Sequence, residues 1–134
     1  MPRLVLIGQV LLLGLLGLGS TTPAGASEVG GSVHAADDKL RRGCHTYSFD
    51  YTVRTPFDDW SLETTVVDPR GEGVASHAFL GPYDPQAQRA AYRLCRWATR
   101  PGRFTVRAKL VAYDDPSEGT EVLLPEATFR LRRR

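Results

Sequence analysis

Two pairs of adjacent aspartates are the residues whose type and spacing could support metal chemistry. Asp58 and Asp59 form one pair, and Asp114 and Asp115 form the other. Ca²⁺ takes six to eight oxygen ligands, which carboxylates and backbone carbonyls on neighbouring loops can supply together. The chain has no Asp-x-Asp-x-Asp-Gly loop, and doubled aspartates at strand ends are more often solvated turn residues. We therefore expect no cofactor, with calcium bound by these four carboxylates as the alternative.

Residues that could catalyse a reaction are scattered along the chain. His34, His45 and His77 lie far apart, and there is no Gly-x-Ser-x-Gly motif, His-Glu-x-x-His motif or glycine-rich phosphate loop. A carboxylate pair such as Asp58 and Asp115 could perform acid–base chemistry only in a pocket that perturbs a pKa, and no pattern in the sequence indicates one. The sequence therefore predicts no catalytic residues and a protein that is not an enzyme.

The two cysteines, Cys44 and Cys95, are too far apart for the Cys-x-x-Cys motif of redox and zinc sites. In an exported protein, an even pair of cysteines in a small domain favours a disulfide. We predict a Cys44–Cys95 disulfide, and two buried free thiols are the alternative. A disulfide also leaves no thiol to act as a nucleophile.

Three aromatic residues, Phe57, Tyr83 and Tyr113, lie in or next to predicted loops. They could form a contact surface for a protein or a glycan, or they could cover the end of the core. Tyr83 is the centre of Gly81-Pro82-Tyr83-Asp84-Pro85, a segment that its prolines stiffen, and a rigid loop lowers the ordering cost of binding. A binding surface is one hypothesis, and inhibition of an extracellular hydrolase through loop 80–89 is the alternative.

The elements that position these residues are predicted to be strands. Apolar and polar side chains alternate with a period of two along most of the chain, which is typical of strands with one buried face. Pro-Arg-Gly and Pro-Gly sequences at 68–71 and 100–103 indicate turns. A helix over 86–94 is the one local alternative. The predicted strands span residues 46–53, 60–66, 73–79, 90–98, 104–113 and 122–132.

Six or seven short strands in about 100 residues fit an antiparallel β-sandwich. With the order Cys44…Trp60…Cys95, this rhythm resembles immunoglobulin-like β-sandwich modules. The resemblance implies an all-β domain of two packed sheets over 44–134. Tyr92 stands three residues before Cys95 instead of two, so no tyrosine corner is carried over. The arginine-rich composition also resembles that of small exported actinobacterial proteins, a likeness that implies no activity.

Strand direction predicts where the loops lie. If successive strands are antiparallel, segments 55–59, 80–89 and 114–120 share one end of the sandwich, and 68–72 and 99–103 share the other. The first end then collects Asp58, Asp59, Asp84, Asp114, Asp115, Glu118 and Glu121. The second collects Arg41, Arg42, Arg70, Arg100, Arg103 and Arg132–Arg134. Such a basic end could meet an anionic polymer or membrane surface, although a charged terminus is usually only solvated.

The N-terminal segment has the parts of a secretory signal peptide. Arg3 precedes an apolar stretch over 4–18, and Ala24-Gly25-Ala26 offers the small residues that signal peptidase accepts. The stretch is shorter than the ~20 apolar residues of a membrane-spanning helix. We therefore predict a signal peptide over 1–26, cleavage after Ala26, and no membrane span in the mature chain. Residues 27–43, which contain few large apolar side chains, are predicted to be a flexible N-terminal arm.

The overall charge narrows the choice of partners. The chain has 17 Lys and Arg against 15 Asp and Glu, a net charge of +2 at pH 7, which gives no general argument for binding nucleic acid. The sequence therefore predicts a secreted, extracellular, non-catalytic binding or structural module. We expect it to be a monomer whose partner is an extracellular protein or glycan.

Overall fold

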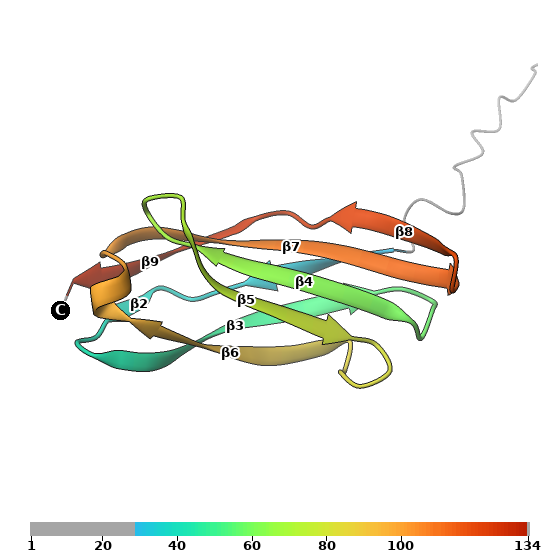
Figure 1. Ribbon diagram of the computed structural model, residues 1–134, viewed down its shortest axis with the longest axis horizontal. Helices are drawn as coiled ribbons and strands as arrows, with labels where there is room; N and C mark the ends of the chain where they lie inside the picture. The colour runs from blue at the N-terminus through green and yellow to red at the C-terminus, as the bar shows by residue number, and fades with distance from the viewer. Residues whose placement is uncertain (1–28, 134) are drawn as a thin grey trace, which may run out of the picture.

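The computed structural model describes residues 29–133, so the predicted signal peptide and its cleavage site lie outside the described residues. Two β-sheets face each other along the length of the molecule (Figure 1). The smaller sheet has the strand order β1-β3-β6, and its neighbouring strands are antiparallel. Its strands are β1 (Gly30–His34), β3 (Cys44–Arg54) and β6 (Ala87–Cys95).

The larger sheet has the strand order β2-β9-β7-β4-β5, and β8 pairs with β7. Its pairs are antiparallel except for β2 and β9, which run parallel. A 3₁₀ turn, η1 (Arg96–Ala98), follows β6 and leads to β7. The strands of this sheet are β2 (Asp38–Leu40), β4 (Trp60–Val67), β5 (Gly73–Leu80), β7 (Gly102–Asp115), β8 (Glu118–Leu123) and β9 (Ala127–Arg133).

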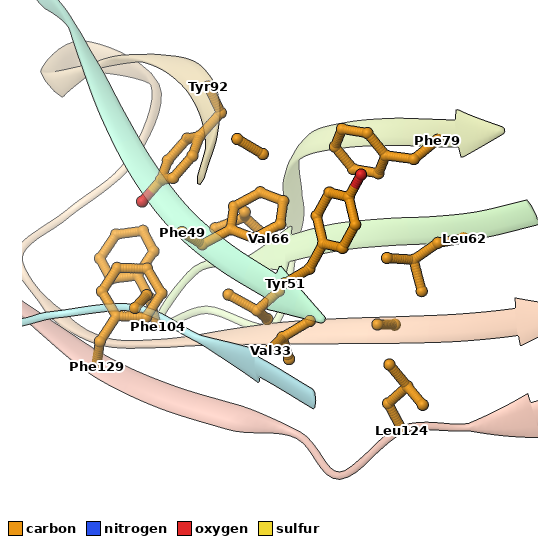
Figure 2. Packing of buried hydrophobic residues seen from close by; sticks show 14 of the residues in the cluster. Val33, Phe49, Tyr51, Leu62, Val66, Phe79, Tyr92, Phe104, Leu124 and Phe129 are labelled. Carbon is orange, nitrogen blue, oxygen red and sulfur yellow. The ribbon is translucent and has the colours of Figure 1, made fainter. Parts of the chain in front are cut away.

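The core lies between the sheets and is built by the period-two patterns of the sequence (Figure 2). On β3, Tyr47, Phe49, Tyr51 and Val53 are buried, while the residues between them are half-buried or exposed. Alternate residues of β7 face the core in the same way. Each such side chain contributes about 1.5–3 kcal/mol when it is fully buried. The predicted strands over 46–53, 60–66, 73–79 and 104–113 are therefore confirmed.

For residues 29–43, the part that the structure describes, the prediction of a flexible arm over 27–43 is wrong. β1 pairs with β3, and β2 pairs with β9, so this segment joins both sheets. Leu40 is fully buried, and a Cβ at Gly31 would overlap the carbonyl oxygen of Thr52 on β3. The ordering comes from backbone pairing with strands that are distant in sequence, which local composition does not reveal.

Two strands have boundaries in the structure that differ from those predicted from the sequence. The strand predicted over 90–98 ends where η1 begins, so Trp97 lies in a 3₁₀ turn instead of on a strand. The strand predicted over 122–132 divides into β8 and β9 around Pro125, which has no N–H to donate to a ladder. The helix considered over 86–94 is wrong, because this segment pairs with β3 along its length.

The chain crosses between the sheets after β1, β2, β3, β5 and β6, and the result is an immunoglobulin-like β-sandwich. The Cys44–Cys95 disulfide is confirmed, but it joins β3 to β6, which are neighbours in one sheet. In immunoglobulin domains the disulfide links the two sheets beside the buried tryptophan. Trp60 is buried at the start of β4, whereas the disulfide joins the start of β3 to the end of β6, and these strand ends lie at opposite ends of the sandwich (Figure 1). The Cys…Trp…Cys order thus matches that family in sequence and differs from it in structure.

Candidate functional site

The loops gather at the two narrow ends of the sandwich, as the strand directions predict (Figure 1). The β3–β4 loop (55–59), the β5–β6 loop (81–86) and the β7–β8 turn (116–117) share the end on the right of the view. The β4–β5 turn (68–72) and η1 lie at the other. We call the first the acidic end, with Asp58, Asp59, Asp84, Asp114, Asp115, Glu118 and Glu121. The second is the basic end, with Arg41, Arg42, Arg70, Arg96, Arg100, Arg103, Arg132 and Arg133.

Main-chain contacts hold the acidic-end loops together. The N–H of Tyr113 on β7 donates to the carbonyl of Asp59 at 2.9 Å, and the N–H of Gly81 donates to the carbonyl of Trp60 at 2.8 Å. A Cβ at Gly81 would overlap the carbonyl oxygen of Asp58, so only glycine can bring the β5–β6 loop this close to the β3–β4 loop. The structure therefore brings both predicted aspartate pairs to one end, on segments that contact each other.

Asp115 shapes its own turn. Its Oδ1 accepts hydrogen bonds from the backbone N–H of Ser117 at 2.7 Å and of Glu118 at 3.1 Å, and from the hydroxyl of Ser117. The Ser117 hydroxyl and the backbone N–H groups lower the pKa of Asp115 below its usual value. One oxygen of this predicted calcium ligand is therefore already occupied by hydrogen-bond donors.

The four predicted calcium ligands share an end but form no ready ligand set. Within residues 29–133, no three His, Cys, Asp or Glu side chains are grouped so as to hold a metal ion. Asp58, Asp59 and Asp114 are exposed. Calcium binding at Asp58, Asp59, Asp114 and Asp115 therefore stays the alternative hypothesis.

The tip of the β5–β6 loop is a closed turn that displays Tyr83. The N–H groups of Tyr83 and Asp84 both donate to the carbonyl of Leu80, at 2.9 and 2.7 Å. The carboxylate of Asp84 in turn accepts from the N–H of Leu80 at 2.8 Å. Tyr83 remains 84% exposed on this turn.

The base of the same loop is fixed to β3. The hydroxyl of Tyr51 donates to the carbonyl of Pro85 at 2.8 Å, and the N–H of Val53 donates to the carbonyl of Gln86 at 2.6 Å. The side-chain amide of Gln86 donates to the carbonyl of Thr55 at 3.3 Å. Burial raises the pKa of Tyr51, so its hydroxyl remains a neutral donor. The loop is thus anchored at both tip and base.

The three predicted binding aromatics have different environments. Phe57 is half-buried and packs against the core, and Tyr113 is also half-buried. Phe57 thus covers the end of the core, which is the alternative hypothesis for it, whereas Tyr113 lies on β7 opposite Gly119 of β8. Tyr83, at 84% exposure, is the most exposed of the three.

The conformation of loop 80–89 bears on the hydrolase-inhibitor alternative. Its first part is the closed turn around Tyr83, and its last part, from Ala87, belongs to β6. A loop that enters a protease cleft as a substrate does must be extended, so that its backbone can pair with the enzyme. The first part is not extended, and the second part is extended but already pairs with β3 along one side.

Trp97 at the basic end is a candidate binding residue that the sequence analysis missed. It is 83% exposed on η1, and it lines a shallow hollow with Arg42, Gly43 and Arg96. Alternation through 90–98 places Trp97 on one face of a strand, but the strand has already ended. The proline and glycine of the turn at 100–103 mark the end of the strand only roughly.

Two local structures hold η1 in place. The Cys44–Cys95 disulfide immediately precedes it, and the N–H of Arg96 donates to the carbonyl of Gly43 at 3.0 Å. On the other side, Nη2 of Arg70 donates to the carbonyl of Ala98 at 2.9 Å. Trp97 is therefore displayed on a rigid support.

Asp68 connects the β4–β5 turn to the segment after η1. Its Oδ1 accepts from the N–H groups of Arg70 at 2.8 Å and Glu72 at 3.0 Å, and its Oδ2 accepts from the hydroxyl of Thr99 at 2.9 Å and from Nε of Arg70 at 3.3 Å. Burial alone would raise the pKa of Asp68. The hydrogen bonds from Glu72, Thr99 and Arg70 outweigh burial and hold this pKa below its usual value.

The histidines are not arranged for catalysis. His34, His45 and His77 lie on β1, β3 and β5. Nε2 of His45 donates to the carbonyl of Arg42 at 2.6 Å, and the ring of His77 stacks against that of Phe79. Among residues 29–133 they form no pair with a nucleophile.

No helix of this part of the chain is long and apolar enough to cross a membrane.

Comparisons with known proteins give likenesses to solved structures. No protein-family model matches the chain, and a search of curated proteins also finds no match. Among solved structures, the chain is similar to the CARDB domain of a Pyrococcus furiosus protein, crystallised with di-metal ions. The two share 11% identity with a TM-score of 0.46, over 81% of this chain and 90% of that one. The assignment of the fold rests on this chain's own strand order.

Proposed function

We propose that this chain is a secreted, non-catalytic binding module that engages an extracellular protein through its acidic end. Export is supported by the signal-peptide features of residues 1–26, and the Cys44–Cys95 disulfide fits an oxidising compartment. The observation that carries the proposal is Tyr83, which is 84% exposed on a loop that hydrogen bonds fix at its tip and base.

Tyr83 has the properties of an interface anchor. Tyrosine is enriched at protein interfaces because its ring provides apolar contact area and its hydroxyl can still form a hydrogen bond. The anchored loop has little conformational freedom left to lose on binding, which lowers the cost of association. The surrounding carboxylates favour a partner with a basic surface and would speed its approach.

The test is a comparison of three forms of the exported chain as bait. Each is immobilised and exposed to the extracellular and envelope proteins of its own organism, and captured proteins are quantified by mass spectrometry. Tyr83→Ala removes the proposed anchor. Leu123→Ala is the matched control, because Leu123 is also an exposed apolar residue, at 75% exposure, but lies on β8 instead of the loop.

We expect the wild type and Leu123→Ala to capture the same protein in equal amounts. Tyr83→Ala should capture at least about tenfold less of it, because the variant has lost an interface anchor. Equal capture by all three forms would contradict a role for the loop. Capture of a glycan in place of a protein, with the same dependence on Tyr83, would change the class of partner.

The inhibitor alternative has a separate assay against a panel of secreted hydrolases. Because the loop is a closed turn, we expect no stoichiometric inhibition. Stoichiometric inhibition that disappears in Tyr83→Ala would instead favour the inhibitor.

A further inference from the structure

The exposure of Trp97 is not explained by the fold. The other tryptophan, Trp60, is buried in the core at 2% exposure, whereas Trp97 is 83% exposed. An indole left in water contributes little to the stability of the sandwich, although it is the side chain with the largest apolar surface. A large aromatic residue held rigidly in solvent is typical of a contact surface.

The arginines around Trp97 lack acidic partners. Arg42 and Arg96 border the hollow beside the indole, and Arg100 and Arg103 follow η1. None of these four forms an ion pair within residues 29–133. By contrast, the sheet-face arginines at 89 and 107 pair with carboxylates at 3.0 Å. The guanidinium groups of Arg42 and Arg96, which lie beside Trp97, are therefore available to an anionic partner.

The carboxylates near this end leave the arginines beside Trp97 unpaired. Asp37 lies 3.8 Å from Arg132 and lines a pocket with Arg103, and Trp97 does not line that pocket. Asp68 is buried and is held by Arg70, and the exposed Glu72 lies 3.9 Å from the same guanidinium. The same Asp68 network fixes the segment that follows η1, through the hydroxyl of Thr99. The basic end therefore combines unpaired positive charge with a fixed position for the indole.

We propose that the basic end docks on an anionic membrane surface, with the Trp97 indole at the level of the lipid headgroups and the surrounding arginines on lipid phosphates. Tryptophan favours the membrane–water interface because one part of its ring is apolar and its N–H is polar. Arginine binds phosphate through two parallel hydrogen bonds. Both side chains thus have a partner in the same layer of an anionic bilayer.

The shape of the basic end favours a surface over a polymer chain. The arginines come from different segments around one projecting aromatic residue, and the hollow beside it is shallow and lined by only four residues. A soluble anionic polysaccharide can be bound by basic side chains alone and gives an exposed indole no apolar environment, whereas a bilayer interface accommodates both a charged end and an apolar tip. Docking by this end would direct the acidic end away from the membrane (Figure 1).

The experiment is cosedimentation of the exported chain, which lacks residues 1–26, with lipid vesicles. Vesicles of phosphatidylcholine alone are compared with vesicles that contain about one-third phosphatidylglycerol, at about 0.05 M and about 0.5 M salt. We expect binding only to the anionic vesicles, and loss of most of it at the higher salt. Tryptophan emission should shift to the blue on binding, since Trp60 is already buried and Trp97 is exposed before binding.

Three variants separate the contributions. Trp97→Ala should weaken vesicle binding about tenfold or more through lost apolar contact. Arg96→Gln should weaken it about fivefold, the effect of one cationic side chain near an anionic surface. Arg54→Gln is the matched control, because Arg54 is an exposed arginine at the end of β3 on the acidic end, and it should bind like the wild type.

Several results would overturn the proposal. These are equal binding to both kinds of vesicle, equal weakening by Arg96→Gln and Arg54→Gln, or unchanged binding by Trp97→Ala. Binding to a soluble anionic polysaccharide without binding to vesicles would assign the basic end to a polymer instead. Circular dichroism of each variant checks that the fold is retained, and the capture of proteins through Tyr83 is measured independently of all these outcomes.

Discussion

Replacing Asp68 with asparagine should strongly destabilise the protein, although the two side chains have nearly the same size and shape. The asparagine side chain would keep one oxygen for the N–H groups of Arg70 and Glu72. Its amide nitrogen would take the place of Oδ2, where Nε of Arg70 and the hydroxyl of Thr99 now donate. The hydroxyl can rotate to accept a hydrogen bond, but the guanidinium can only donate. The variant therefore sets two donors against each other in a buried site.

The size of the effect follows from the bonds that change. A hydrogen bond to a charged group contributes about 1.5–3 kcal/mol, and leaving a buried donor unpaired costs about 1–3 kcal/mol. The guanidinium of Arg70 is partly exposed and can turn to water, so the lower halves of these ranges apply. We expect Asp68→Asn to lower the free energy of unfolding by about 2–4 kcal/mol. Glu72→Gln is the control and should cost under about 0.5 kcal/mol, because that ion pair is exposed and long.

The assay is urea unfolding followed by circular dichroism at several pH values. The pKa of Asp68 is lower in the folded chain, so its stabilising effect is present above the unfolded pKa of about 3.9 and is lost as pH falls toward the folded value. Wild-type stability should therefore decrease below about pH 4, and the difference from Asp68→Asn should shrink there. A loss at neutral pH below about 0.5 kcal/mol, or a difference independent of pH, would refute the reasoning.

Three further predictions concern the disulfide, the N-terminal strands and calcium. Replacing Cys44 and Cys95 with serine should lower the free energy of unfolding by about 4 kcal/mol in urea titrations, because the bridge closes a loop with a sequence separation of 51; an unchanged midpoint would contradict this. Gly31→Ala should lower the free energy of unfolding by about 1–3 kcal/mol because it forces β1 away from Thr52, while Ser32→Ala at an exposed position should lower it by under about 0.5 kcal/mol. Equally small effects of both variants would support the flexible arm that the sequence predicts. Millimolar calcium should leave the melting temperature unchanged, because the described residues contain no grouped ligand set; a rise in melting temperature and heat in a calorimetric titration would establish the calcium site.

Local patterns predicted most of the strands and the charged residues that gather at each end of the molecule. Alternation with a period of two is a property of neighbouring residues, so β3, β4, β5 and β7 could be located from the sequence. Short connections between them imply antiparallel directions, and these directions placed the aspartates and arginines at opposite ends. Of the candidate binding residues, Tyr83 could be found because its turn carries glycine and proline at the positions that a loop requires.

The sequence by itself determined the alternation, the turns and the charge at each loop, because each depends on residues close together in the chain. Tertiary structure alone decided that residues 30–40 form strands β1 and β2, that Asp68 is buried, that the cysteines pair within one sheet and that Trp97 is exposed. Each of these depends on a strand or turn that is distant in sequence. The physical reason is that a backbone ladder or a buried carboxylate is stabilised by its partners, and local composition does not show where those partners lie.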